Sequence, residues 1–348
     1  MIRRTKPPSL TEQITRRSQK PIEKKPEYEG NTELMISTGS TLLDLAISGG
    51  RIRGGGIPLG ILVEISGVSG SGKTVLLCEI AGDIQRKQGE VMFHDPEARL
   101  NTLFAQIFDL QLKAEDYYRP NTVPEVFKAV REWKPKGELQ GIFADSLAAL
   151  STDMEMDKKE GDKMGMRRAK EFSEELRKTC RILAQNNYLM VCSNQVRVNV
   201  DGNAFTPKYT TPGGEAIGFY SSLRLQAKSS SKLWQEESVA GKDIKRAIGI
   251  TTEFEVNKSS IWKPFRSAPV TIIFDYGIDD IRENLKFLKT YTKATTYKVG
   301  EHNLGQSMEM AILKVEKMNL EKQLKEEVID LWMDIESRFD SERKTKKR

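Results

Sequence analysis

The chain has 348 residues, of which 38% are hydrophobic and 30% are charged, and its formal net charge is +6. This length and composition are typical of a globular protein with one large domain and small appendages, and the mild basic excess is compatible with a polyanionic partner. Three widely spaced cysteines and two histidines argue against a disulfide framework and a histidine-rich metal centre, so we expect a reducing, cytoplasmic compartment.

The N-terminal segment, residues 1–35, is basic and contains prolines. Its charges are not followed by an apolar core, so we expect no secretory signal, and no stretch of the chain has the apolar length of a membrane span. Ser9 and Glu12 have the spacing of a capping box, which predicts a short helix to about Ser18. A frayed tail and a helical arm that docks on a neighbouring subunit both fit this segment.

From about residue 36 the pattern predicts an α/β core with a mostly parallel central sheet, because short apolar strands alternate with longer helices. The predicted strands are 60–67, 90–95, 141–146 and 188–196, and the predicted helices are 73–87, 123–133 and 166–187. Residues 250–275 look antiparallel. We place a boundary at residue 279, a small, mostly helical unit at 280–338 with a turn region at 296–307, and a basic tail at 339–348.

One glycine-rich stretch, "GVSGSGKT", fits the pattern G-x-x-x-x-G-K-[ST] and lies between a predicted strand and a predicted helix. Backbone amides in such a loop cradle phosphate oxygens, and the helix N-terminus adds the positive end of its dipole. The lysine would reach the β- and γ-phosphates and the threonine hydroxyl would ligate magnesium, so the stretch predicts ATP and Mg²⁺. The nucleotide-binding candidates here are Gly67, Val68, Ser69, Gly70, Ser71, Gly72, Lys73 and Thr74.

Polar residues follow three of the predicted strands. Asp145 ends the apolar strand of "GIFADS" and is the candidate magnesium carboxylate. In "FHDPEARL", Asp95 and Glu97 come just past a strand, at the sheet edge where the phosphates would lie, and Glu97 is the candidate base that orients the attacking water. Gln195 could hydrogen-bond a γ-phosphate from the same edge, an assignment that the residues alone leave as a guess.

Several further segments occur in a specific order and spacing: "ISTGSTLLDLAISGG", "DPEARL", "FADSLAAL", "SNQVR", "TTPGGEAIGFYSSLRL", "KSSIWKPF" and "YKVGEHNLGQS". With the glycine-rich loop, they make the chain resemble the bacterial and phage RecA recombinases from about residue 36 to 335. The resemblance implies a RecA-like P-loop ATPase with an N-terminal helical arm and a small α-rich C-terminal domain that binds duplex DNA. It further implies self-association into helical filaments on single-stranded DNA and strand exchange with a homologous duplex.

Carried onto this sequence, the resemblance implies that Glu97 is the catalytic glutamate, Asp145 the magnesium-associated aspartate and Gln195 the γ-phosphate sensor. It also implies that Phe104 stacks on adenine, with Asn101 near the base. In the family, two lysines reach the nucleotide of the neighbouring subunit. This chain keeps Lys258 as a catalytic candidate, but the second position is Ser260, and Lys263 or Arg266 are the candidates to compensate.

The resemblance places two DNA-binding loops at about 154–168 and 197–214. Phosphate contacts need cations or backbone amides, and Gly213 and Gly214 would expose successive amides at a helix start. The DNA-binding candidates are Arg167, Arg168, Arg197, Lys208, Gly213 and Gly214. Phe219 matches a family residue at the subunit contact, while Pro212 and Glu215 depart from the family's pattern. A RecA-fold hexameric helicase or remodelling ATPase, and a non-catalytic filament paralogue, are the alternative functions.

Overall fold

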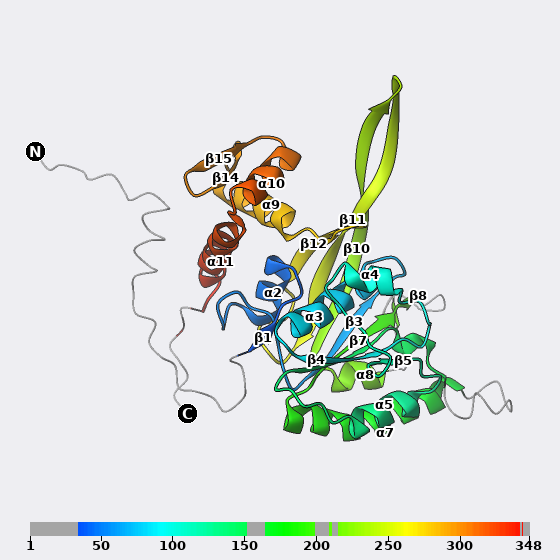
Figure 1. The fold of residues 1–348 in the computed structure, drawn as a ribbon. Coiled ribbons are helices and arrows are strands. Elements are labelled where there is room, and N and C mark those ends of the chain that lie inside the picture. Colours follow the sequence, from blue (N-terminus) through cyan, green and yellow to red (C-terminus); the bar gives the residue numbers. More distant parts are fainter. Residues whose placement is uncertain (1–33, 152–163, 199–208, 211–214, 342, 344–348) are drawn as a thin grey trace, which may run out of the picture.

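The computed structural model describes residues 34–151, 164–198, 209–210, 215–341 and 343. Its centre is a nine-stranded sheet in the order β13-β12-β11-β10-β3-β7-β6-β4-β5 (Figure 1). The parallel part consists of β3 (Leu62–Gly67), β4 (Glu90–His94), β5 (Tyr117–Tyr118), β6 (Gln140–Ala144) and β7 (Leu189–Gln195), and β10 (Leu223–Val239) runs parallel to β3. The mostly parallel central sheet predicted from the sequence is confirmed.

The other side of the sheet is antiparallel, as expected for residues 250–275. It contains β11 (Lys242–Ser259), β12 (Ser267–Ile273) and β13 (Gly277–Ile278). The strand β11 is far longer than the segment "GITTEFEVNK" that predicted it. Its outer half pairs with β10 alone and forms a hairpin that projects from the body of the protein (Figure 1). This projecting hairpin was not predicted from the sequence.

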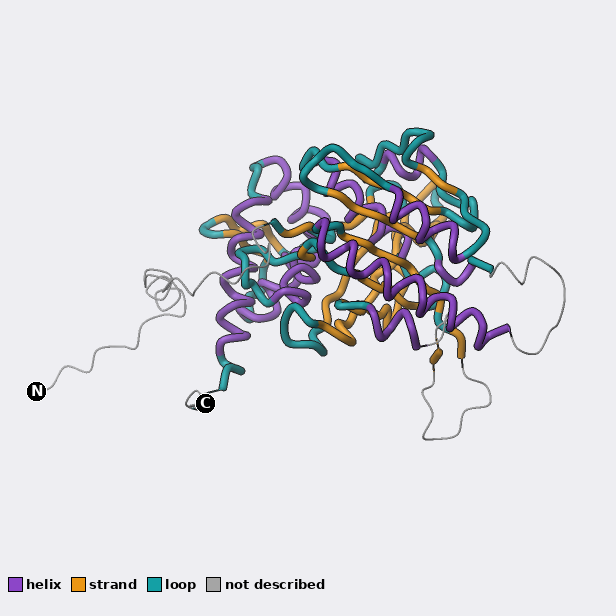
Figure 2. Tube along the Cα trace, turned by 90° about the horizontal axis from the view of Figure 1, so that it is seen from below, coloured by secondary structure: helices purple, strands orange, loops and turns teal. Residues whose placement is uncertain are grey.

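Helices cover both faces of the sheet, because alternate strand residues point to opposite sides. Ile142 and Met190 pack with α5 (Val123–Glu132), α7 (Met164–Asn186) and α8 (Glu215–Tyr220), whereas their neighbours Phe143 and Val191 pack with α2 (Thr41–Ser48) and α3 (Lys73–Arg86). Figure 2 shows the long helices lying across the strands. Each apolar strand therefore contributes to two hydrophobic clusters, which is why these strands are apolar without alternation.

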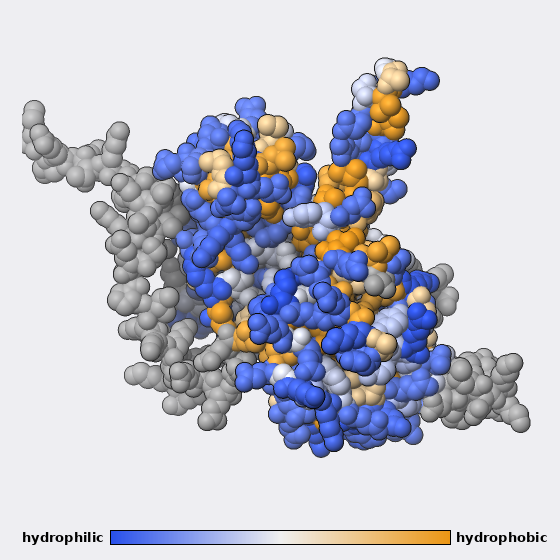
Figure 3. Space-filling model, in the orientation of Figure 1, coloured by the Kyte–Doolittle hydropathy of each residue, from blue (hydrophilic) through white to orange (hydrophobic). Residues whose placement is uncertain are grey.

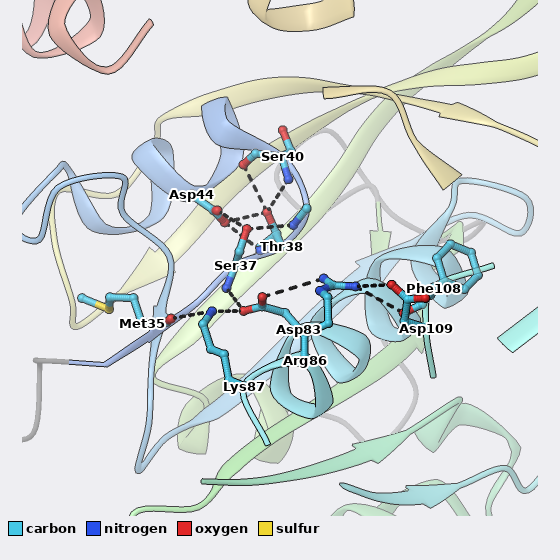
Figure 4. A network of polar contacts seen from close by, with 11 residues as sticks. Met35, Ser37, Thr38, Ser40, Asp44, Asp83, Arg86, Lys87, Phe108 and Asp109 are labelled. Carbon is cyan, nitrogen blue, oxygen red and sulfur yellow. Dashed lines mark hydrogen bonds and ion pairs between the residues drawn. The ribbon is translucent and has the colours of Figure 1, made fainter. Parts of the chain in front are cut away.

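A polar network joins the first described segment to α2 and α3 (Figure 4). Thr38 donates to Asp44 from its amide and its hydroxyl, at 2.8 and 2.7 Å. The amide of Ser37 donates to Asp83 on α3 at 2.8 Å, and Lys87 pairs with the same carboxylate. The network positions α2 and the short ribbon of β1 (Met35–Ile36) and β2 (Ile57–Pro58) against the sheet.

The C-terminal part contains α9 (Asp280–Thr292), α10 (Met308–Lys317) and α11 (Glu321–Ser337). The expected turn region at 296–307 contains a small β-hairpin, β14 (Tyr297–Val299) and β15 (His302–Gly305). Leu285, Val299 and Val328 belong to the same hydrophobic cluster as α2 and α3. Arg266 pairs with Glu336 at 2.9 Å, so α11 is attached to the sheet by charge as well as by apolar packing.

The remaining described elements are short: α4 (Thr102–Gln106), the 3-10 turn η1 (Leu147–Ala149), β8 (Arg197–Val198) and β9 (Tyr209–Thr210). The helix expected near residues 9–18 lies outside the described residues, as does most of the basic tail. Within the described ranges, no helix has the length and apolar character needed to cross a membrane.

Candidate nucleotide-binding site

A cavity of about 600 Å³ opens where β3, β4, β6 and β7 end, beside the N-terminus of α3. This is the edge of a parallel sheet where ligands of α/β proteins bind. The cavity collects residues that are far apart in the sequence. It is lined by residues 69–75 and by Asp95, Glu97, Arg99, Leu100, Asn101, Phe104, Asp145, Ser146, Gln195, Ile250, Ile272 and Phe274.

The glycine-rich loop leads directly into α3, whose first turn has no capping side chain. Gly70 and Gly72 have φ of 73° and 86°, and a Cβ on Gly72 would lie 2.3 Å from Ile272 Cδ1, so glycine is required there. The Lys73 ammonium donates to the carbonyls of Gly67 and Val68 at 3.1 and 2.8 Å. Burial lowers the pKa of Lys73, and the carboxylates of Asp145 and Glu97 oppose that shift. The loop therefore offers uncapped amides and a buried cation to an anion.

Asp145 lies just beyond the end of β6 and meets Thr74 across the cavity floor. The Thr74 hydroxyl donates to Asp145 Oδ2 at 2.5 Å, and the Ser193 hydroxyl donates to Oδ1. Burial raises the pKa of Asp145, while the two hydroxyl donors and Lys73 lower it. Adjacent hydroxyl and carboxylate oxygens are ligands that Mg²⁺ prefers.

No group of three or more potential metal-binding His, Cys, Asp or Glu side chains occurs in the part of the chain that the structure describes. The adjacent oxygens of Thr74 and Asp145 are of the kind that suit a magnesium ion whose other ligands come from phosphate oxygens and water.

Glu97 lines the same cavity, next to Ser146, the residue that follows Asp145. Its Oε1 accepts hydrogen bonds from Ser146 Oγ at 3.1 Å and from Gln195 Nε2 at 3.4 Å. Its Oε2 lies 2.6 Å from the guanidinium of the exposed Arg99. Glu97 and Gln195 are thus in contact although 98 positions separate them in the chain. An acid and an amide held together at the phosphate end of the cavity can orient a water molecule there.

Asp95, the other acid of this segment, is already engaged within the protein. Its Oδ2 accepts from the amide of Leu100 at 2.8 Å and from the Tyr117 hydroxyl at 2.7 Å. Only 2% of Asp95 is exposed, so its role is to hold the loop that carries Glu97. This geometry favours Glu97 over Asp95 as the residue that contacts the phosphate region.

The remaining wall is apolar and suits a flat base. Phe104, on α4, packs edge-on against Phe108 with ring centroids 5.1 Å apart. Asn101 caps α4, because its Oδ1 accepts from the Leu103 amide at 2.8 Å. Both residues were expected near the base, and both line the cavity.

Ile250, Ile272 and Phe274 also line the cavity with apolar side chains, and none of the three was predicted from the sequence. They come from β11, β12 and the residue just after β12, and half of Phe274 is exposed. A large aromatic residue directly after an apolar strand was the available signal. It became meaningful only once the strand order was known.

Lys258 does not reach this chain's own cavity. Its ammonium donates to the carbonyls of Gly218 and Phe219 at the end of α8, at 2.9 and 2.8 Å. Burial and then the nearby Arg224 lower the pKa of Lys258, and Glu64 opposes the shift. Phe219 is 74% exposed, so this end of α8 presents a large apolar side chain next to the lysine.

The candidates to replace the second lysine are engaged elsewhere. Lys263 pairs with Asp340 at 2.8 Å, and Arg266 pairs with Glu336. The Ser260 hydroxyl donates to the carbonyl of Ser222 at 3.3 Å. In this conformation both cations therefore attach the C-terminal part to the sheet.

A buried ion pair fixes the centre of the sheet behind the site. Glu64 on β3 is fully buried; it accepts from Arg224 Nε at 2.6 Å and from Asn194 Nδ2 at 2.9 Å. The contacts join β3 to β7 and β10. Because Asn194 immediately precedes Gln195, they also help to fix the strand end that presents the glutamine to the cavity.

The predicted DNA-binding side chains lie outside the part of the chain that the structure describes. Arg167 and Arg168 fall in the first turns of α7 and Arg197 begins β8, but only their backbone is described. Lys208, Gly213 and Gly214 lie outside the described residues. The backbone of Arg197 pairs with Thr210 and that of Val198 with Tyr209, so a two-residue ribbon closes the base of this loop.

Comparison with known proteins agrees with this geometry. The model of the RecA N-terminal domain matches residues 18–279. The chain belongs to the RecA family. Protein RecA of Thermus thermophilus is 34% identical over 284 residues, which cover 80% of this chain and 79% of that relative. Protein RecA of Borrelia duttonii is 32% identical over 281 residues, covering 80% and 74%, and that of Anaplasma marginale is 31% identical over 281 residues, covering 79% and 74%.

Proposed function

We propose that this RecA-family chain is a single-stranded-DNA-dependent ATPase that assembles into helical filaments and exchanges strands with a homologous duplex. The observation that carries the proposal is the contact between Glu97 and Gln195 in the cavity of the glycine-rich loop. It links an acid suited to orienting water with the strand that leads into the second candidate DNA loop. One contact can thus relate the state of the nucleotide to the state of the DNA-binding segment.

In this proposal the loop amides and Lys73 bind the phosphates of ATP, and Thr74 and Asp145 hold Mg²⁺. The bound ion would neutralise charge that develops on the phosphates. Glu97 orients and deprotonates the attacking water, and Phe104 and Phe274, which both line the cavity, enclose the base. Lys258 and Phe219 would meet the neighbouring subunit, and Arg167, Arg168, Arg197, Lys208, Gly213 and Gly214 would contact single-stranded DNA.

We further propose that residues 1–35 act as the polymerisation arm, that 36–279 form the ATPase core, and that 280–338 capture duplex DNA, with 339–348 as a basic tail. Lys289 on α9 lies over the Tyr297 ring, with its ammonium 4.1 Å from the ring centroid. A cation on an aromatic platform near the β14–β15 hairpin is suited to a phosphate backbone.

The test is ATP hydrolysis with and without single-stranded DNA for the wild type and for Glu97→Gln. We expect Glu97→Gln to bind ATP and DNA and to lose turnover by a factor of about 10² to 10⁴, because a general base contributes that much. Glu132→Gln, an exposed acid on α5, is the matched control and should hydrolyse ATP normally. Normal turnover by Glu97→Gln would refute the assignment of Glu97 as the base. If single-stranded DNA does not stimulate ATP hydrolysis by the wild type, the proposed function is refuted.

The alternative, a ring-forming helicase or remodelling ATPase, uses the same loop and acid. Electron microscopy with single-stranded DNA and a slowly hydrolysed ATP analogue separates the two, because the proposal requires open filaments and the alternative closed rings.

A further inference from the structure

The hairpin formed by β10 and β11 extends well beyond the sheet. Pairing of β10 with β3 ends at Gln226, and pairing of β11 with β12 starts only at Gly249, so residues 234–247 are held by their mutual pairing alone. We call residues 232–248 the arm; Figure 1 shows the hairpin projecting from the body. Its turn is formed by Ala240 and Gly241, with φ of 52° and 75°. A free two-stranded ribbon of this kind is narrow enough to lie in or along a nucleic-acid groove.

A tryptophan with two lysines occupies one face of the arm. Trp234 is 50% exposed, and the ammonium groups of Lys232 and Lys245 lie 5.6 and 5.8 Å from its ring centroid. Trp234 is in register with Ala247, and Glu236 with Lys245, so these side chains share a face. Neither lysine has a carboxylate partner within 4.0 Å among the described residues. The cluster combines exposed aromatic surface with two cations whose charge is not neutralised by an ion pair.

The charges on the arm are unevenly distributed. Lys232 and Arg246 lie next to the sheet, and Lys245 is in register with Glu236 about halfway along the arm. Glu237, Asp243 and Lys242 lie towards the tip, so the part next to the sheet has the positive excess. Figure 3 shows the arm with apolar and charged side chains mixed along it. A polyanion would therefore favour the half next to the sheet over the tip. Lys232 is in register with Ile250, which lines the nucleotide cavity.

We propose that the half of the arm next to the sheet is a further contact for single-stranded DNA. In this proposal Lys232 and Lys245 contact the phosphate backbone, and an unpaired base stacks on the exposed part of Trp234. Cations combined with an aromatic platform are the chemistry by which proteins bind single strands without sequence choice. The inference rests on the proposed DNA-binding function and adds residues outside its two candidate loops.

The test uses the full-length protein with a non-hydrolysed ATP analogue and fluorescent oligo-dT. We expect Trp234→Ala to weaken binding about tenfold, the loss of one stacked base, and Trp234→Phe to retain most of the affinity. For Lys232→Ala/Lys245→Ala, the slope of log affinity against log salt should fall by about 1.4, since each phosphate contact on a single strand contributes about 0.7.

Lys242→Ala is the matched control, because Lys242 is in register with Val239 on the opposite face. It removes one positive charge from the same arm, against two in the lysine pair, and should leave affinity and salt slope nearly unchanged. ATP hydrolysis without DNA should be equal in all variants, which shows that they are folded. Equal losses for Lys242→Ala and the lysine pair would overturn the inference, as would losses confined to duplex DNA or to self-association. If the wild type binds DNA and every arm variant binds equally well, the arm contact is refuted and the proposed function stands. If the wild type binds no DNA, both fail.

Discussion

Asp44 on α2 is a carboxylate buried inside the network of Figure 4, with 1% of its surface exposed. Burial raises its pKa from 3.8 to about 6, although Ser37 and Thr38 donate hydrogen bonds to it. Each pKa unit is worth about 1.4 kcal/mol, so this carboxyl penalises folding by about 3 kcal/mol once it must ionise. Because the folded state holds the proton more tightly, the stability from Asp44 is present below pH 3.8 and is lost as the pH rises to about 6.

Asp44→Asn removes this titration and keeps the shape of the side chain. The amide oxygen can accept both bonds from Thr38, which meet Asp44 Oδ1, and the amide nitrogen can donate to Ser37 Oγ after its hydroxyl rotates. We therefore expect the free energy of unfolding of the wild type to lose about 2 kcal/mol more than that of Asp44→Asn between pH 4 and pH 7, because part of the total is already lost at pH 4. Urea unfolding followed by circular dichroism, repeated across this range, measures the difference. Parallel stability curves for the two proteins would refute the assigned pKa and the reasoning from burial.

Three further predictions concern the site and its support. Phe274→Ala should weaken ATP binding by roughly tenfold, since an apolar side chain beside the base is lost, whereas Phe274→Tyr should bind ATP as the wild type does. Titration with a fluorescent nucleotide measures both affinities, and equal affinities would contradict a role of Phe274 at the base. Arg224→Ala should destabilise the fold by about 3 to 5 kcal/mol, because it leaves Glu64 buried without its cation. The double variant Arg224→Ala/Glu64→Gln should recover part of that loss. Urea unfolding measures both variants, and a loss under about 1 kcal/mol for Arg224→Ala would show that water reaches Glu64. Lys258→Ala should reduce the cooperativity of ATP-dependent assembly on DNA, measured by light scattering, and unchanged assembly would show that Lys258 serves only the end of α8.

The core of the nucleotide site could be predicted from the sequence because its information is local. The glycine-rich loop, Asp145 after an apolar strand and Glu97 after another are each defined within a few residues. A parallel sheet brings such strand ends together at one edge, so their convergence follows from the fold class. The pattern of apolar strands and longer helices likewise predicted β3, β4, β6 and β7 to within about two residues of their ends.

The parts that were missed depend on pairing between distant strands. Phe274 and Ile250 line the cavity only because β11 and β12 lie beside β10, an order that no local pattern contains. The arm was missed because residues 232–248 mix charged, polar and isolated apolar residues without a clean period of two, and a register shift between Leu233 and Trp234 interrupts the ladder there. The contact of Lys258 with α8 could not be predicted either, since it is specified by the tertiary structure rather than by the residues next to Lys258 in the sequence.

Because β11 is one continuous strand, the number of residues between its side chains sets the distances between three parts of the molecule. One strand of 18 residues carries Lys258 near its inner end, Ile250 at the cavity wall and Lys245 on the arm. At about 3.3 Å per residue, residue count alone sets these sites roughly 26 and 17 Å apart along the strand. Removing two residues between Lys245 and Ile250 would draw the lysine about 7 Å towards the nucleotide on the same face. Removing one residue would turn the Lys245 side chain to the opposite face of the hairpin. The number of residues therefore sets the distance, and whether that number is even or odd sets the face.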